Sequence, residues 1–239
     1  MQRNYRQWTQ YPYPGEKNPP KGSATPGFWP MFFMSKEQNG TFLDPFHQLI
    51  HWQIKNPDAI DWKKELTFVE QTLKALTPEQ IRIAQYWGTG ELSAKITTTI
   101  FSLCEKYRIG SPHTARILGY FHAAINDTFI ITWYLKYLWD VARPNQYEQN
   151  LSPVLLTPRF PSYPSAHATI AGCSENLLRH FFPKETTSLK KWMEESAQSR
   201  LYAGVHFKVD NDQGLRLGRQ IGDIIVKLVE AQNVRSDYA

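Results

Sequence analysis

The sequence predicts an all-α protein, a helical bundle that follows an irregular N-terminal arm. Apolar residues recur with the helical period of about 3.6 in several long segments after residue 57. Residues that start and stop helices separate these segments, and no stretch shows the strict apolar–polar alternation of a half-buried strand. We therefore expect an arm over residues 1–57 and a helical, catalytic domain over residues 58–239.

Composition favours a folded protein without a nucleic-acid partner. The chain has 239 residues, among them 8 Trp, 12 Tyr and 13 Phe, which suffice for one large core. The net charge of +5 is only mildly basic, and no run of Lys and Arg marks a nucleic-acid-binding arm. The two cysteines, Cys104 and Cys173, are too few for a disulfide framework.

The sequence also favours a soluble protein. Residues 1–15 lack the apolar core of a signal peptide, which indicates a cytoplasmic location, or a secreted one if a leader had been trimmed. The most apolar window, residues 120–139, contains four side chains that are costly in lipid, namely His122, Asn126, Asp127 and Lys136. The mean hydropathy is −0.48, and we expect no membrane span.

The elements follow from local signals taken in order. Proline and aromatic residues predict that the arm is irregular and packs on the domain, with one short helix near residues 46–55. The following helices are expected at residues 58–76, 77–88, 91–107, 112–142, 165–182, 188–204 and 210–232. The second of these starts with a proline at its first position and a capping-box glutamine. Residues 144–164 have no helical period, and a loop of this length is often functional.

The stretch from Phe160 to Thr169 organises the candidate site, because a proline-broken loop becomes a helix at Ser165. Ser165 is a good N-cap residue, since its hydroxyl can accept a hydrogen bond from an amide of the first turn. The amides of Ala166 and His167 then lack helical partners, and with the positive end of the helix dipole they attract an anion. His167 can exchange a proton with the bound group. Taken alone, the stretch is also compatible with an ordinary capped helix and a surface histidine.

Two further groups of residues complete the candidate site. Lys136 and Arg143 are seven residues apart, close to two helical turns, so both cations fall on nearly one face just before the predicted helix ends. Arg200 is followed by His206 and Asp210, which are four residues apart. A helix starting there would let the Asp210 carboxylate hold an imidazole nitrogen of His206.

Together these side chains provide what a tetrahedral oxyanion needs. Arg143 and Arg200 offer bidentate forks, and Lys136 adds a point charge. A carboxylate behind His206 fixes the tautomer and raises the basicity of the ring, as suits a nucleophile or a metal ligand. His167 remains available as a general acid or base. Each residue alone could belong to a solvated face or a surface ion pair, but the combination favours a site.

These residues resemble the signature of the vanadium haloperoxidase and type 2 phosphatidic acid phosphatase superfamily. That signature reads K-x6-R-P, then P-S-G-H, then S-R-x5-H-x3-D. Ten of its eleven specified positions match in order, over about residues 77–225, and Ala166 stands where the superfamily has glycine. The superfamily fold is a helical bundle, so the resemblance and the helical periodicity agree on an all-α chain.

Further details are similar to the soluble bacterial haloperoxidases rather than to the phosphatases. Trp133 stands three residues before Lys136, and Asp127 stands six before Trp133. Phe160 stands five residues before Ser165, where the haloperoxidases carry an aromatic residue or histidine beside the halide site. The resemblance thus implies a halide or substrate pocket at Trp133 and Phe160, although plain core packing would account for both side chains.

The resemblance implies a mechanism for each activity. The anion would be held by Lys136, Arg143, Ser165, Ala166, His167 and Arg200. In a haloperoxidase, vanadate would bond to His206, Lys136 would polarise bound peroxide, and His167 would shuttle the proton while halide is oxidised. In a phosphatase, His206 would become phosphorylated, His167 would protonate the leaving alcohol, and Asp210 would orient His206.

The predicted activity is therefore that of a vanadium-dependent haloperoxidase, with vanadate as cofactor, or phosphate in the same site, and with peroxide and halide as substrates. The alternative is an acid phosphatase that hydrolyses phosphate monoesters through a phosphohistidine. A third hypothesis, a phosphate- or sulfate-binding protein, would need neither a free His167 nor Asp210 behind His206. The resemblance also implies a homo-oligomer.

Overall fold

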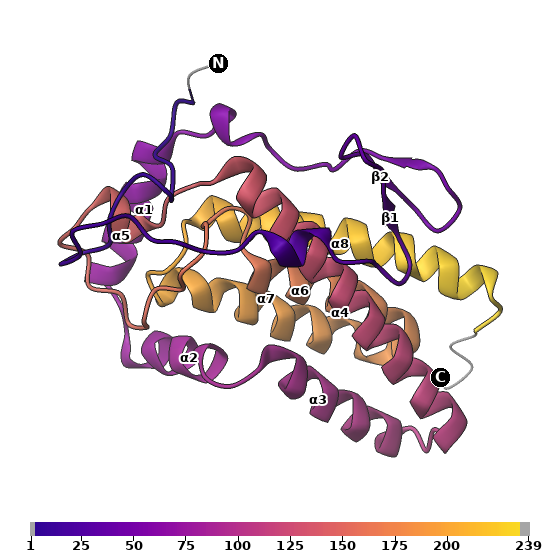
Figure 1. Cartoon of the computed structure of the whole chain (residues 1–239). Coiled ribbons are helices and arrows are strands. Elements are labelled where there is room, and N and C mark those ends of the chain that lie inside the picture. Colours follow the sequence, from indigo (N-terminus) through magenta and orange to yellow (C-terminus); the bar gives the residue numbers. More distant parts are fainter. Residues whose placement is uncertain (1–2, 235–239) are drawn as a thin grey trace.

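The computed structural model describes residues 3–234, and eight α-helices form the body of that part of the chain (Figure 1). The helices are α1 (Trp62–Lys74), α2 (Pro78–Gly88), α3 (Leu92–Lys106), α4 (Ser111–Trp139), α5 (Pro144–Tyr147), α6 (Ala166–Phe181), α7 (Thr186–Tyr202) and α8 (Lys208–Ala231). Short 3₁₀ turns lie at Thr25–Phe28, Pro57–Ala59 and Pro183–Glu185. The predicted all-α fold is confirmed. None of the helices described between residues 3 and 234 has the length and apolar character that crossing a membrane requires.

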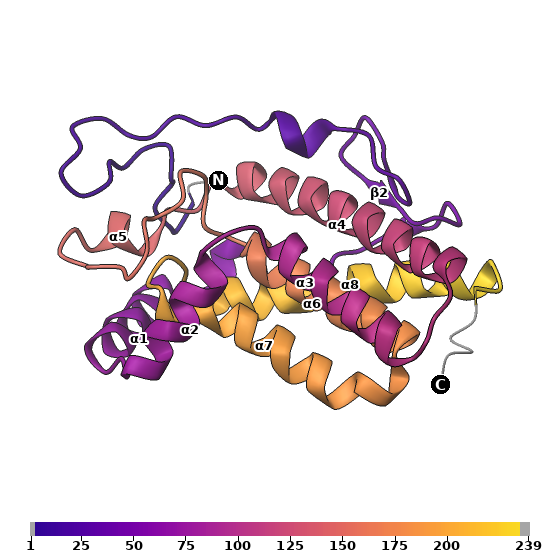
Figure 2. The ribbon, with the colours of Figure 1, turned by 90° about the horizontal axis from the view of Figure 1, so that it is seen from below.

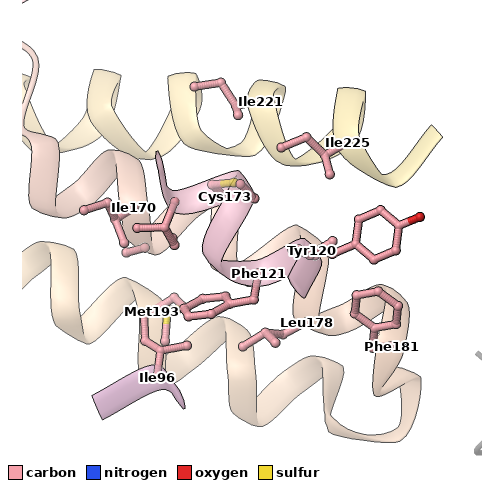
Figure 3. Close-up of a cluster of buried hydrophobic side chains, with 14 of the residues drawn as sticks. Ile96, Tyr120, Phe121, Ile170, Cys173, Leu178, Phe181, Met193, Ile221 and Ile225 are labelled. Carbon is pink, nitrogen blue, oxygen red and sulfur yellow. The ribbon is translucent and has the colours of Figure 1, made fainter. Parts of the chain in front are cut away.

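The central element of the bundle is α6. It packs most extensively against α8 and also contacts α7, α4 and α3. Figure 3 shows side chains from these helices meeting around Phe121, Cys173 and Met193, all of which are fully buried. Removing a side chain such as Phe121 from water contributes about 1.5–3 kcal/mol. Because other helices pack against α6 on several sides, the position of its first turn is well defined.

Three glycines of α8 allow α6 to lie unusually close. Gly214, Gly218 and Gly222 are spaced at four-residue intervals, so they share one face of the helix. The α6 backbone occupies the space that side chains at these positions would need. The close approach brings the start of α6 against the start of α8, where the Ser165 amide donates to the Asp210 carbonyl oxygen at 3.0 Å.

The N-terminal segment runs alongside α4, on the side away from α7 (Figure 2). A small antiparallel sheet interrupts it, with strands β1 (Ser35–Lys36), β2 (Phe42–Leu43) and β3 (Leu49–Ile50) in that order. The prediction of a helix near residues 46–55 is wrong. The Asp44 carboxylate instead accepts hydrogen bonds from the Phe46 and Gln48 amides at 2.8 Å each, in a turn that leads into β3. Two-residue strands are too short to show alternation, so the sequence did not indicate them.

The end of α4 also differs from the prediction. The helix stops at Trp139 rather than near residue 142, because Asp140 adopts a left-handed conformation with φ of 56°. The Asp140 carboxylate accepts hydrogen bonds from the Thr9 hydroxyl and the Gln7 side chain. The residue that ends α4 is therefore hydrogen-bonded to the N-terminal segment. The predicted loop at residues 144–164 contains the single helical turn α5.

Asp127, in the middle of α4, fastens the N-terminal segment to the bundle. Its fully buried carboxylate accepts hydrogen bonds from the backbone amides of Phe32 and Phe33 at 2.7 Å each, and of Met34 at 3.3 Å. Burial raises the pKa of this carboxyl group, and the amide donors act in the opposite direction.

Replacing Asp127 with alanine is expected to lower the free energy of unfolding by about 2–4 kcal/mol, because the amides that bind it would lose a charged acceptor. Urea denaturation of the purified protein measures this change. Asp212→Ala is the matched control, since Asp212 is half exposed and pairs with Lys208 on the surface. The control should change stability by less than about 0.5 kcal/mol. Equal effects of the two substitutions would contradict the role assigned to Asp127.

Candidate active site

The first turn of α6, the start of α5 and the connection between α7 and α8 meet beside a cavity of about 210 Å³. Five of the predicted site residues line this cavity, namely Phe160, Ala166, His167, Arg200 and His206. Four others lie buried behind its wall, namely Lys136, Arg143, Ser165 and Asp210. Trp133 is not among the lining residues.

His206 and Asp210 form the buried pair that their spacing predicted. The distance from His206 Nδ1 to Asp210 Oδ2 is 2.8 Å. The same carboxylate oxygen accepts a hydrogen bond from the Phe207 amide at 3.0 Å and so stabilises the start of α8. His206 itself precedes α8, which begins only at Lys208, so the pair joins a connecting residue to the first helical turn. The carboxylate holds the proton on Nδ1 and leaves Nε2 as the acceptor nitrogen.

Ser162 is a site residue that the sequence reasoning missed. Its hydroxyl donates a hydrogen bond to Asp210 Oδ2 and lies 3.3 Å from His206 Nδ1. Its carbonyl oxygen accepts a hydrogen bond from the Lys136 ammonium at 2.7 Å. Ser162 occupies no position of the signature, and only its place in the loop three residues before the Ser165 cap could have drawn attention to it.

Arg143 reaches the site from outside α4, which corrects the prediction that it shares a helix face with Lys136. The chain turns at Asp140, and Arg143 then adopts an extended conformation as the residue before α5. Its guanidinium group donates from Nε to the Phe160 carbonyl oxygen at 3.0 Å and from Nη1 to the Val205 carbonyl oxygen at 2.8 Å. Nη1 also lies 2.9 Å from His206 Nε2. Nη2 is buried and has no hydrogen-bond partner within residues 3–234.

Lys136 is fully buried at the end of α4. Its ammonium group donates to the carbonyl oxygens of Pro161 and Ser162 at 2.7 Å each, so it fixes the loop that leads into α6. The Phe160 ring covers both cations, with its centroid 5.3 Å from Lys136 Nζ and 4.9 Å from Arg143 Cζ. Phe160 therefore belongs to the cavity wall and also shields the basic side chains behind it.

The first turn of α6 has the expected cap. The Ser165 hydroxyl accepts a hydrogen bond from the Ala168 amide at 3.3 Å. The amides of Ala166 and His167 have no acceptor among residues 3–234. His167 is half buried, its Nε2 lies 2.9 Å from the Ser196 hydroxyl, and the Trp87 ring stands perpendicular to it at 6.3 Å.

Trp133 packs behind the cavity wall. Its ring lies 4.7 Å from the Phe160 ring, and its Nε1 donates to the Ser23 carbonyl oxygen at 2.9 Å. Of the two aromatic residues expected in a halide or substrate pocket, the structure thus places Phe160 at the cavity and Trp133 against the outer side of Phe160.

Burial and mutual repulsion shift the pKa values of the site. Burial, followed by the charge of Arg143, holds the pKa of His206 well below its usual value, and burial and Arg200 do the same for the pKa of His167. Burial lowers the pKa of Lys136 well below its ordinary value and that of Arg200 to about 10. Burial raises the pKa of Asp210 to about 6. The two histidines are therefore neutral near pH 7, and the positive charge of the site comes from its Lys and Arg side chains.

The available groups are donors and cations rather than cation ligands. Among residues 3–234, no three His, Cys, Asp or Glu side chains come together as a metal-chelating group. An oxyanion suits such donors, because guanidinium groups and free helix amides bind its oxygens directly.

Comparisons with known proteins agree with this architecture. A family model described as the VCPO second helical-bundle domain matches residues 182–234. No curated protein matches the chain.

Several solved structures are similar. The first bacterial vanadium-dependent iodoperoxidase superposes with a TM-score of 0.66 at 20% identity, covering 85% of this chain and 63% of that one. A holo-type bacterial vanadium-dependent chloroperoxidase gives 0.63 at 16% identity, covering 75% and 51%. A transmembrane PAP2-type phosphatidylglycerolphosphate phosphatase from Bacillus subtilis gives 0.53 at 19% identity, covering 71% and 86%.

The chain spans less than two thirds of the length of these two haloperoxidases. At such identities the similarity concerns the fold. The chain has the fold of the superfamily that comprises the vanadium haloperoxidases and the PAP2 phosphatases, and the match over residues 182–234 supports the same superfamily.

Proposed function

We propose that the chain is a vanadium-dependent haloperoxidase-like enzyme that oxidises halide with hydrogen peroxide. The observation that supports this most is the arrangement at His206. Asp210 holds Nδ1 of this imidazole, while Nε2 lies next to the guanidinium group of Arg143 at the wall of a cavity. A nitrogen whose tautomer is fixed from behind suits a ligand or a nucleophile.

The residues present fit a tetrahedral vanadate or phosphate. Arg143 Nη2 is buried without a partner, the Arg200 side chain lines the cavity, and the amides of Ala166 and His167 are free. These groups would hold the oxygens, and His206 Nε2 would hold the central atom. When bound, vanadate supplies a Lewis-acidic centre that activates peroxide towards halide.

His167 would move the proton. Its pKa lies well below its usual value, so the ring is neutral near pH 7 and can accept a proton. If Nε2–H donates to the Ser196 hydroxyl, Nδ1 is the accepting atom. Ser162 and Asp210 would keep His206 in one orientation, and Lys136 would keep the loop around Ser162 in place.

An acid phosphatase is the second candidate. The same donors would hold a phosphate monoester. His206 Nε2 would attack the phosphorus atom, and His167 in its protonated form would give its proton to the leaving alcohol as the ester P–O bond breaks. One observation favours it, namely that only Phe160 of the two aromatic residues expected at a halide site lines the cavity.

Two assays on one preparation separate the candidates. Protein stripped of vanadate is assayed with added vanadate, hydrogen peroxide and bromide or iodide for halogenation of a dye, and separately with a phosphate monoester. The proposal expects halogenation only after vanadate is added, and phosphate should inhibit it by competition. Phosphatase turnover that vanadate merely inhibits would establish the second candidate instead.

Sulfate binding should strengthen as the pH falls from 8 to 6. In the free site, burial and the neighbouring cations hold the pKa of His206 below its usual range; a bound dianion would offset those cations and raise that pKa. Sulfate binding should therefore take up protons. For each unit by which the pH is lowered, the dissociation constant of sulfate should fall roughly two- to tenfold, since tenfold is the limit for uptake of one proton. Titration calorimetry in buffers of different ionisation enthalpy measures the uptake. His206→Asn should remove most of it, and uptake that is absent from the wild type would contradict the electrostatics described here.

A further inference from the structure

We propose that the cavity beside His167 and Arg200 is a subsite for an uncharged, single aromatic ring of the substrate. The inference rests on the proposed anion site and adds the chemical class of the organic group that binds next to it. In the haloperoxidase that group is the ring to be halogenated, and in the phosphatase it is the alcohol part of an aryl monoester.

The cavity is lined by two chemically different sets of residues. One set consists of Arg200 and the two histidines of the anion site. The rest of the wall is largely apolar and includes Trp87, Leu92, Phe129, Phe160 and Ile170. These residues come from α2, α3, α4, the loop before α6 and α6 itself, so several elements of the bundle build the wall. A substrate that filled this space would place its anionic or reactive group against Arg200 and the histidines and an apolar group against the rest of the wall.

The Trp87 part of the wall is already fixed. Trp87 is fully buried, its Nε1 donates to the Glu195 carboxylate at 3.0 Å, and its ring packs against Trp192 at 5.1 Å. The ring stands at 90° to the His167 imidazole. A ligand that contacts this surface does not have to immobilise the side chains, so less conformational entropy is lost on binding.

Phe129 is an exposed aromatic residue of the cavity wall. Its side chain is 39% exposed although it faces a cavity, and within residues 3–234 it makes none of the ring–ring contacts that occupy most of the other aromatic side chains near the site. Aromatic rings favour offset or edge-to-face partners beyond the effect of burial alone. A ring in the cavity would provide that partner.

The volume of the cavity and the charge of its lining residues further restrict which ligands can bind. The volume of about 210 Å³ is below the roughly 300–1,000 Å³ of sites for drug-sized ligands, so the occupant is small. The exposed Glu91 also lines the cavity, and its carboxylate would repel a second anionic group on the ring. One uncharged ring meets both conditions and also provides the aromatic partner for Phe129.

Binding of non-hydrolysable phosphonates tests the proposal without any turnover. Calorimetry compares phenylphosphonate, methylphosphonate and inorganic phosphate with the wild type, Phe129→Ala and Phe101→Ala. Phe101 is the control, because it is an exposed phenylalanine of α3 that does not line the cavity. We expect phenylphosphonate to bind about three- to tenfold more tightly than methylphosphonate, with the preference lost in Phe129→Ala and kept in Phe101→Ala.

The outcomes separate this inference from the proposed function. Equal affinities of the two phosphonates for the wild type, with phosphate still bound, would overturn the aromatic subsite and leave the anion site intact. Failure to bind phosphate would overturn both. Phenol is then titrated against the phosphate-saturated protein. Binding of both together supports a ring that enters separately as a halogen acceptor, and binding of phenylphosphonate alone supports an ester-linked ring.

Discussion

Replacing His206 with alanine is expected to lower kcat by roughly four to six powers of ten, whichever of the two reactions the chain catalyses. Both reactions need His206 Nε2 on the central atom of the anion, and within residues 3–234 the other histidine at the cavity, His167, has a serine hydroxyl rather than a carboxylate beside its ring. The fold should survive, because Asp210 keeps the Ser162 hydroxyl and the Phe207 amide as partners, and Arg143 keeps two carbonyl acceptors. Steady-state kinetics gives kcat, and the thermal unfolding midpoint checks the fold.

Two other histidines provide the comparison. His122→Ala should leave kcat unchanged, because His122 is exposed on α4, contacts Thr97 and does not line the cavity. His167→Ala should lower kcat by about two to four powers of ten while sulfate still binds, as expected for a proton-transfer residue. Activity of His206→Ala within tenfold of the wild type would mean that the nucleophile or ligand has been assigned to the wrong residue.

Much of the fold followed from local sequence signals. The capping box before α2, the serine cap of α6 and the apolar period of α8 each act within a few residues, so the helix positions could be predicted closely. The sheet at residues 35–50 could not, because its two-residue strands carry no period and depend on a turn held by Asp44.

The spacing of residues in the sequence was enough to propose most of the site residues. It was not enough to predict which backbone segments carry them into the site. A continuous helix would carry Lys136 and Arg143 on one face, whereas the chain leaves the helix at Asp140 and brings Arg143 in through an extended segment. At that turn, the Asp140 side chain contacts Thr9 and Gln7, which lie more than a hundred residues earlier in the chain. A local sequence pattern cannot predict contacts over such a separation. Ser162 was missed for a related reason, since its partners are distant in sequence.

Gly218→Ala is expected to destabilise the protein by about 3 kcal/mol or more, although alanine is the better helix former. A methyl group at Gly218 would lie 1.9 Å from the Thr169 carbonyl oxygen and 2.8 Å from the Cys173 amide nitrogen, and both are backbone atoms of α6 that cannot rotate away. The helices would have to separate, and the start of α6 would then move away from Asp210. For a chain of this length the loss corresponds to a fall in Tm of roughly 6–12 °C.

Gly119→Ala is the control that isolates this effect. Gly119 is also a helical glycine, but it is exposed on α4 and an added methyl group meets no atom within 4 Å. That substitution should raise stability by about 0.5–1 kcal/mol, because it removes backbone freedom from the unfolded chain without a clash. Opposite signs for the two glycines, measured by urea denaturation, are what a close α6–α8 contact requires. If Gly218→Ala were as stable as Gly119→Ala, α6 and α8 could not lie at the distance that sets Ser165 against Asp210, and the geometry of the anion site would have to be different.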